Sequence, residues 1–357
     1  MGGGLMQLVA YGAQDVYLTG DPQITYFKVV YRRHTNFSME CIEQTFNGTP
    51  GPNNKVSCTV SRNGDLIGAM HIEVPRNTTD MSSTAGEEAV FANIIKEVEV
   101  EIGGQKIDKH YGAWLDIWYG LTTPESKAVA KLIPAAQSEM AYVPLQFWFN
   151  RNVGLALPLI ALQYHEVKLN ITFGDGKDNA AGTPADNFTM ADAKLWVDYI
   201  YLDTEERKRF AQMSHEYLID QLQFPGAEAS STKFRLNFNH PVKELVWSAT
   251  FAASSTWKLM LNGHDRFAAR ESTYFSRLQK YYHHTAINNT ATGGSDNVHV
   301  YSFALRPEEH QPSGTCNFSR IDNATLTVSA GVACSIYAVN YNVLRVVSGM
   351  GGLAYSN

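Results

Sequence analysis

Short segments in which apolar and polar residues alternate limit the fold of this chain more than any other feature. In KEVEVEIGG, residues 96–104, Val98, Val100 and Ile102 alternate with three glutamates. The segments 165–173 and 324–331 follow the same pattern. Successive strand side chains point to opposite faces, so each segment predicts a strand with one buried face. The segments end in Gly, Pro, Asn or Asp at a spacing typical of antiparallel sandwiches, which predicts an all-β protein.

Helical signals are scarce, and the clearest one lies between two β-rich halves. Asp203 is a candidate N-cap, and Glu206 follows three residues later, as in a capping box. Apolar residues then recur at helical spacing as far as residue 224: Phe210, Met213, Tyr217 and Leu218. We predict that a helix fills this region and connects two domains. A second short helix is predicted at 111–121, in a loop of the first half.

The predicted organisation has four parts. They are an N-terminal arm (1–23), a first β domain (24–203), a helical connector (204–224) and a second β domain (225–357). The first domain opens on DPQITYFKVVYRRHTNF, residues 21–37, which we interpret as one long strand. The first half of this strand is apolar on both faces, so we expect a neighbouring subunit to cover it. The candidate interface residues are Tyr26, Phe27, Val29, Val30 and Tyr31.

Composition is consistent with a protein that hides much of its surface. Charged residues make up 18% of the chain, below the roughly 25% of typical soluble domains. Aromatic residues make up 11%, and the net charge is −6. A negative net charge argues against direct nucleic-acid binding, because such binding requires a basic surface.

Motifs for catalysis or metal binding are not completed in this sequence. His165-Glu166 and His215-Glu216 begin like the zinc motif HExxH, but leucine and isoleucine take the place of the second histidine. We place His283-His284 in a strand, where neighbours face opposite sides and cannot share an ion, so surface or interface histidines are expected. The aromatic group Trp114, Trp118 and Tyr119 is interpreted as core rather than as a sugar-stacking platform. We therefore predict no catalytic residues, no metal and no cofactor.

Two sequons are candidate glycosylation sites. Asn187 and Asn288 each begin an Asn-x-Ser/Thr sequence in a segment interpreted as an outer loop. Asn170 also begins a sequon, but it lies within a predicted strand, where a glycan fits poorly.

Several long blocks of the sequence resemble the major capsid proteins of nucleocytoplasmic large DNA viruses. The first is LVAYGAQDVYLTGDPQITYFKVVYRRHTNF at 8–37, and the second is PLQFWFNRNVGLALPLIALQYHEVKLNITF at 144–173. Two more are LNFNHPVKELVWSATF at 236–251 and YNVLRVVSGMGGLAYSN at 341–357. These blocks follow one another down the whole chain, which makes the resemblance specific.

The resemblance implies a double jelly roll, in which two eight-stranded antiparallel β-sandwiches lie in tandem with short helices in the loops and connector. It also implies a structural capsid protein, not an enzyme, whose homotrimers form pseudo-hexameric capsomers of an icosahedral shell. The implied partners are copies of the chain itself, minor capsid proteins and a membrane layer beneath the shell. The implied location is the virion capsid, after synthesis and assembly in the host cytoplasm.

Two other function classes stay open at this point, and so does the choice between a principal capsid protein and a close paralogue. A jelly roll could also be a carbohydrate-binding module, or an enzyme of the cupin type with convergent histidines. Loops near 121–140, 174–188 and 285–297 are shorter than is common in the family. The sequence therefore leaves open whether this is a principal capsid protein or a close paralogue.

The four cysteines give the first testable prediction. Cys41, Cys58, Cys316 and Cys334 form no CxxC pair, and the N-terminus lacks the basic start and apolar stretch of a secretory signal. We therefore expect folding in a reducing cytosol and four unpaired thiols. Thiol titration of freshly purified, denatured protein should count four reactive groups. A count of two or none would contradict the prediction.

Overall fold

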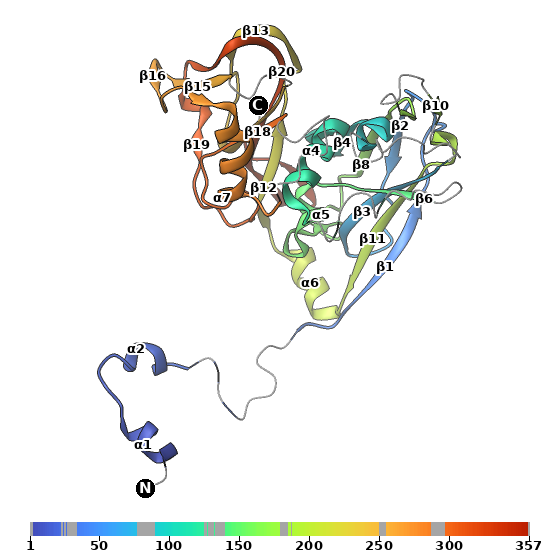
Figure 1. The fold of residues 1–357 in the computed structure, drawn as a ribbon. Helices are drawn as coiled ribbons and strands as arrows, with labels where there is room; N and C mark the ends of the chain where they lie inside the picture. The colour runs from blue at the N-terminus through green and yellow to red at the C-terminus, as the bar shows by residue number, and fades with distance from the viewer. Residues whose placement is uncertain are drawn as a thin grey trace. The chain divides into compact units, whose positions relative to one another are not determined.

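The chain folds into two compact units, Met1–Phe37 and Ser38–Asn357, in a computed structural model (Figure 1). The residues that the structure describes are 3–22, 24, 26, 34–76, 90–124, 127, 132, 140–178, 185–186, 188–249, 255–286 and 297–355.

The N-terminal unit contains two short helices, α1 (Gly3–Val9) and α2 (Val16–Thr19). Asp15 organises the turn before α2, because its Oδ2 accepts a hydrogen bond from the Gly12 amide at 2.7 Å. The large apolar side chains described in this unit are at least half exposed: Met6, Leu8, Val9, Tyr11, Val16, Tyr17, Leu18, Ile24, Tyr26 and Phe37.

The long strand predicted from residue 24 is wrong at its described start. Ile24 has no regular structure and Tyr26 lies in a turn. Their side chains are 84% and 99% exposed, so no sheet buries them. Strand β1 begins only at Phe37, and residues 27–33 lie outside the described residues.

The first barrel consists of two sheets, with strand orders β1-β11-β3-β6 and β2-β8-β4-β5. Counted along the chain, these eight strands pair as 1-8-3-6 and 2-7-4-5, which is the jelly-roll arrangement. The short β7 adds to β3. The bounds are β1 Phe37–Gln44, β2 Lys55–Thr59, β3 Leu66–Pro75, β4 Ile95–Ile102, β5 Gln105–Tyr111, β6 Met140–Pro144, β7 Leu157–Pro158, β8 Val167–Phe173 and β11 Lys194–Leu202.

The core of the first barrel lies between these sheets and confirms the alternation predicted from sequence. Val98, Val100 and Ile102 of β4 are fully buried. Glu97 lies on the other face of β4, where its Oε2 is 2.5 Å from Lys109 Nζ on β5. The hydrogen bond with Lys109 lowers the pKa of Glu97, so the pair is charged at neutral pH.

The second barrel repeats the arrangement, with β20 serving as both the seventh and the eighth strand. The first part of β20 pairs with β15, and its last part pairs with β12 and β14. Between the two parts, residues 329–331 are exposed, and the register with β13 shifts there. The bounds are β12 His215–Gln223, β13 Ala227–Arg235, β14 Pro241–Ser248, β15 Thr256–Leu261, β16 His264–Asp265, β17 Arg270–Glu271, β18 Val298–Ser302, β19 Cys316–Asn317, β20 Ala324–Val347 and β21 Met350–Leu353.

Short helices occupy the loops, and the two that matter most follow the fifth strand of each barrel. These are α4 (Gly112–Thr122), as predicted, and α7 (Gln279–His283), which continues a π-helical turn at Tyr274–Leu278. Among the described residues, no helix is both long and apolar enough to span a membrane. The remaining elements are α3 Val90–Ile94, α5 Trp148–Arg151, α6 Thr204–Gln212, the 3₁₀ turns Val153–Leu155, Met190–Asp192 and Phe318–Arg320, and the strands β9 Lys177–Asp178 and β10 Ala185–Asp186.

The predicted connector helix is correct at its start and wrong at its end. Asp203 is the N-cap of α6, and its Oδ1 accepts a hydrogen bond from the Thr204 amide at 2.7 Å. The helix ends at Gln212, however, and the segment 215–223 is strand β12, which pairs with β20 along its whole length. The segment is extended because this conformation buries apolar side chains on both faces. Ile219 joins the core cluster of the first barrel, and Leu222 joins a separate buried cluster.

Gly112 allows α4 to start against the first barrel, and this gives the second testable prediction. A Cβ at Gly112 would lie 1.9 Å from the Ile95 carbonyl oxygen and 2.6 Å from Ala92 Cα. Backbone atoms cannot move aside as a flexible side chain can, so we expect Gly112→Ala to lower the free energy of unfolding by at least ~1–3 kcal/mol. Urea unfolding followed by circular dichroism measures this.

The matched control is Gly331→Ala, because the nearest atom to its added Cβ would be 3.5 Å away. The free energy of unfolding of this variant should lie within about 1 kcal/mol of the parent value. Equal stability of the Gly112 and Gly331 variants would contradict the close approach at α4.

Candidate functional site: the seam between the two barrels

The interface and glycosylation residues predicted from sequence are only partly placed. Tyr26 lies in the N-terminal unit, as described above. The other four candidates for the interface strand lie outside the described residues: Phe27, Val29, Val30 and Tyr31. Asn187 and Asn288 also lie outside them. Both hypotheses stay predictions.

The best-defined site in the second unit is the seam, where α4 of the first barrel packs on the second barrel. One side of α4 faces its own barrel through Leu115 and Tyr119. The other side contributes Trp114, Ile117, Trp118 and Leu121 to a separate buried cluster. The aromatic residues near 114–119 are therefore core, as predicted from sequence, and they provide no exposed sugar-stacking platform.

The second barrel supplies the other half of this cluster from the outer face of one sheet. Its members are Leu222, Val246, Val298, Val300, Tyr337 and Val339. The Trp114 and Tyr337 rings lie 5.2 Å apart between centroids. Full burial of one large apolar side chain contributes about 1.5–3 kcal/mol, so a cluster of this size holds the barrels together firmly.

A buried acid links the barrels beside the apolar cluster. Asp220 Oδ2 on β12 is 2.9 Å from Lys243 Nζ of the second barrel and 3.2 Å from Arg151 Nη2 of the first. The Arg151 guanidinium also lies 5.0 Å from the Trp118 ring centroid. Burial lowers the pKa of Lys243, while Asp220 acts in the opposite direction. Separating one partner from a buried ion pair is costly, so the Arg151–Asp220 contact, which crosses between the barrels, favours this arrangement of the two.

A second buried charge group surrounds His284, directly after α7. His284 Nε2 is 3.1 Å from Glu244 Oε2, and Nδ1 is 3.0 Å from Glu308 Oε1. Carboxylate oxygens face both ring nitrogens, so the doubly protonated imidazolium is the form that fits. Burial alone would lower the pKa of His284, but the two carboxylates outweigh it and raise the pKa to about 9.

This geometry corrects the prediction for His283-His284. Residues 279–283 are helical, not extended, and the His284 side chain is buried rather than on the surface. The segment after His284 also reaches the first barrel, because the Ala286 amide donates to the Leu121 carbonyl at 2.9 Å. Within the described part of the chain, no group of three or more His, Cys, Asp or Glu residues is placed to hold a metal ion.

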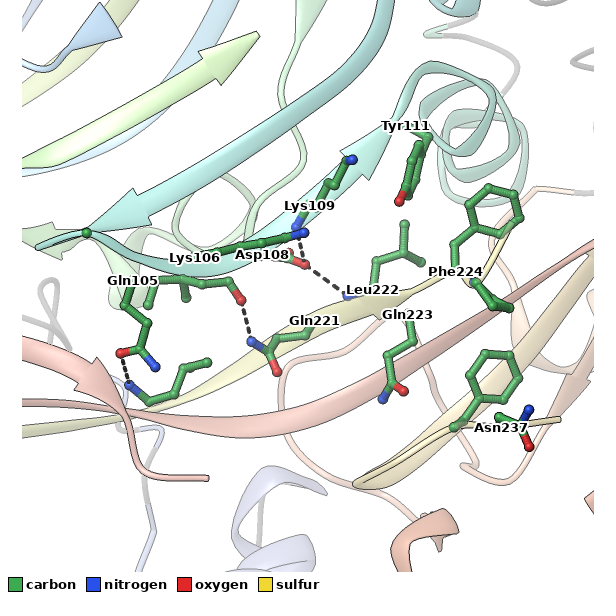
Figure 2. Close-up of a pocket in the computed structure, with 15 residues that line it drawn as sticks. Gln105, Lys106, Asp108, Lys109, Tyr111, Gln221, Leu222, Gln223, Phe224 and Asn237 are labelled. Carbon is green, nitrogen blue, oxygen red and sulfur yellow. Dashed lines mark hydrogen bonds between the residues drawn. The ribbon is translucent and has the colours of Figure 1, made fainter. Parts of the chain in front are cut away.

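Two sheet edges meet across the seam without pairing through their backbones. The Leu222 amide of β12 donates to Asp108 Oδ1 of β5 at 3.0 Å, and Gln221 Nε2 donates to the Ile107 carbonyl. Figure 2 shows these side chains between the two strands, beside a groove of about 640 Å³ that also contains Phe224. Side-chain caps of this kind keep exposed strand edges from pairing with other chains.

The C-terminal hairpin closes the seam at another point. The Gly351 amide of β21 donates to His165 Nδ1 at 3.1 Å, and the Tyr164 amide donates to the Gly349 carbonyl at 3.0 Å. Gly349 has φ +80°, and a Cβ there would lie 2.6 Å from the Tyr164 ring. Glycine is therefore required for the hairpin to lie this close to the first barrel.

The cysteines take no part in the seam. All four lie within the described residues as free thiols, with Cys58 and Cys334 buried and Cys41 exposed. Burial raises the pKa of the Cys58 thiol to about 11. A thiol with so high a pKa is a poor nucleophile at neutral pH.

These features define a structural class: two jelly rolls in one chain, joined into a single body by a buried apolar and ionic seam. Two family models match the chain. One is "Major capsid protein N-terminus", over residues 25–203. The other is "Large eukaryotic DNA virus major capsid protein", over 206–255 and 248–352.

Individual relatives agree over their full length. The major capsid protein of Pyramimonas orientalis virus is 54% identical over 409 residues, and that of Paramecium bursaria Chlorella virus 1 is 43% identical over 445 residues. Both matches cover 100% of this chain and 100% of the relative. The quasi-atomic model of the PBCV-1 virus capsid matches with a TM-score of 0.79 at 39% identity, covering 93% of this chain and 100% of that one.

This chain belongs to the major capsid proteins of large eukaryotic DNA viruses. The resemblance and the double jelly-roll fold predicted from sequence are thus confirmed. The Faustovirus major capsid protein shares the fold at 11% identity, with a TM-score of 0.72.

The His284 group gives the third testable prediction, in the form of a pH dependence. The pKa of His284 is about 9 in the folded chain and 6.5 in the ordinary, unfolded state. The group therefore stabilises the fold fully below pH 6.5 and loses this effect as the pH rises through 9, an effect of up to ~3 kcal/mol. The loss of stability caused by His284→Asn should be largest near pH 6 and shrink towards pH 9 in urea unfolding experiments.

His264→Asn is the matched control, since His264 is exposed on β16. This variant should follow the parent at every pH. A His284→Asn effect that grows between pH 6 and 9 would show that the imidazolium is not the stabilising form.

Proposed function

We propose that the chain assembles into homotrimers with a pseudo-hexagonal outline, which tile the icosahedral shell of a large double-stranded DNA virus. The seam is the observation that carries this proposal. It joins two barrels of the same topology side by side in one chain, and three such pairs give six similar lobes around a three-fold axis. The similarity to the PBCV-1 capsid supports the same arrangement.

The role is structural rather than enzymatic. The Asp220 and His284 groups pair opposite charges at 2.9–3.2 Å, which suits a fixed joint and not a reaction centre. The carbohydrate-binding alternative loses its support, because Trp114 and Trp118 are buried. Self-association is therefore the activity that these residues support best.

The shell would also contact other components. We propose minor capsid proteins and an underlying membrane layer as partners, and the host cytoplasm as the place of assembly. The exposed apolar side chains of the N-terminal unit support such contacts, since large exposed apolar surfaces mark interaction sites.

The mass of the native assembly gives the fourth testable prediction. Native mass spectrometry should find a species of three times 39.7 kDa. An obligate interface buries on the order of 2,000 Å² or more, so this species should persist on dilution to nanomolar concentration. A monomer under those conditions would leave the fold and family unchanged and remove the capsomer proposal.

A further inference from the structure

The helices α4 and α7 occupy the same place in the two barrels. Helix α4 follows β5, the edge partner of β4, and precedes β6, the partner of β3. Helix α7 follows β17, a partner of β15, and precedes β18, the partner of β14. In each barrel the helix thus lies between the fifth and the sixth strand. Helix α4 packs on the neighbouring barrel of its own chain, and α7 holds the equivalent position in the second barrel.

The two helices also bury corresponding sides against their own barrels. Leu115 and Tyr119 of α4 lie in the first core. Phe275 and Gln279, spaced in the same way, are buried in the second barrel. The neighbouring barrel covers the other side of α4, whereas the described side chains on the other side of α7 are exposed.

The bare side of α7 forms an apolar patch, which we call the α7 patch. Leu278, Tyr281 and Tyr282 are 40%, 67% and 63% exposed. Leu305, 73% exposed, adjoins them, because its carbonyl oxygen lies 3.0 Å from His283 Nδ1. When Phe275 is matched to Leu115, Leu278 and Tyr281 fall at the positions of Trp118 and Leu121, which the seam buries.

The surface equivalent to the receptor of α4 lies on the first barrel, where its described side chains are partly exposed. The second barrel receives α4 on the outer face of β14, β18 and β20, so the equivalent face is that of β3, β6 and β11. Met140 and Tyr142 of β6 and Met39 of β1, at the other edge of this sheet, are 38%, 37% and 54% exposed on this side. We call this surface the sheet patch.

Aromatic and acidic groups fill the centre of the sheet patch. Trp196 Nε1 donates to Glu73 Oε2 at 2.7 Å, and Tyr142 lies directly opposite Glu73 in the sheet register. Glu43 and Asp198 lie on the same face, and Lys194 Nζ lies 3.4 Å from Glu43 Oε2. The segment 274–283, by contrast, contains the exposed Arg277 and the half-buried His283 and no acidic residue. The charges of the two patches are therefore complementary.

We propose that the α7 patch of one copy docks on the sheet patch of the next copy, repeating between chains the seam that α4 makes within each chain. This inference rests on the proposed trimer and names the surfaces that hold it together. The contact is head-to-tail, so it must close into a ring or grow without end. Internal and external seams then alternate around the ring, and three chains present six barrels.

The test uses one variant in each patch. Tyr281→Asp combined with Tyr282→Asp places acids of the α7 patch against an acidic surface, and Tyr142→Arg places a cation in the sheet patch. Each variant alone should lose the trimer and give the monomer in native mass spectrometry, with unchanged circular dichroism. Tyr355→Asp is the control, because Tyr355 is 64% exposed and lies outside both patches, and it should stay trimeric.

Mixing the two monomeric variants tests the direction of the contact. One intact α7 patch and one intact sheet patch remain in the mixture, so a heterodimer of one chain of each kind should form, and no trimer. If both variants remain trimeric while the parent is a trimer, the patches are wrongly assigned and the proposed function stands. If the parent itself is monomeric, the proposed function fails as well.

A cysteine pair gives a second measurement that does not depend on disrupting the fold. The chain carrying Tyr142→Cys and Tyr282→Cys should oxidise to a covalent three-chain species on non-reducing gels. The chain carrying Tyr355→Cys and Tyr282→Cys should not. Equal cross-linking of the two pairs, or none of the first, would overturn the proposed contact.

Discussion

The packing of α4 on the outer face of the second barrel is the interaction on which the rest of the structure depends. Without it, two jelly rolls joined by the nine-residue α6 would be free to move against each other. Apolar burial supplies the strength of the joint. The Asp220 group supplies its geometry, because a displaced barrel would separate Arg151 of the first barrel from Asp220 of the second.

The same joint explains how a protein made of strands avoids uncontrolled association. The edges of β5 and β12 come together at the seam, and side chains of Asp108 and Gln221 occupy their hydrogen-bonding groups. In the proposed trimer, specific association is left to side-chain surfaces, the α7 patch and the sheet patch. A shell protein needs this separation, since it must bind copies of itself in one arrangement and in no other.

Local patterns in the sequence predicted the local structure and failed where distant contacts decide. The strands at 96–104, 165–173 and 324–331 follow from alternation alone, and so does the N-cap at Asp203. The segment 215–223 has apolar residues that fit either a helix or a strand, and only pairing with residues more than a hundred positions away makes it β12. Local patterns could not predict the seam, because it joins residues that are far apart in the sequence. The one available signal was Lys243-Glu244, two charged residues inside an apolar run, which indicates buried charge.

The most direct test of the account is an electron cryomicroscopy reconstruction of the purified assembly. The central claim is that one type of seam occurs both within and between chains. It predicts a ring of six barrels in which α7 of each chain lies against β3 and β6 of the next, with Tyr282 and Tyr142 buried at the contact. A trimer in which both patches face solvent, or in which each patch meets its own copy, would contradict it.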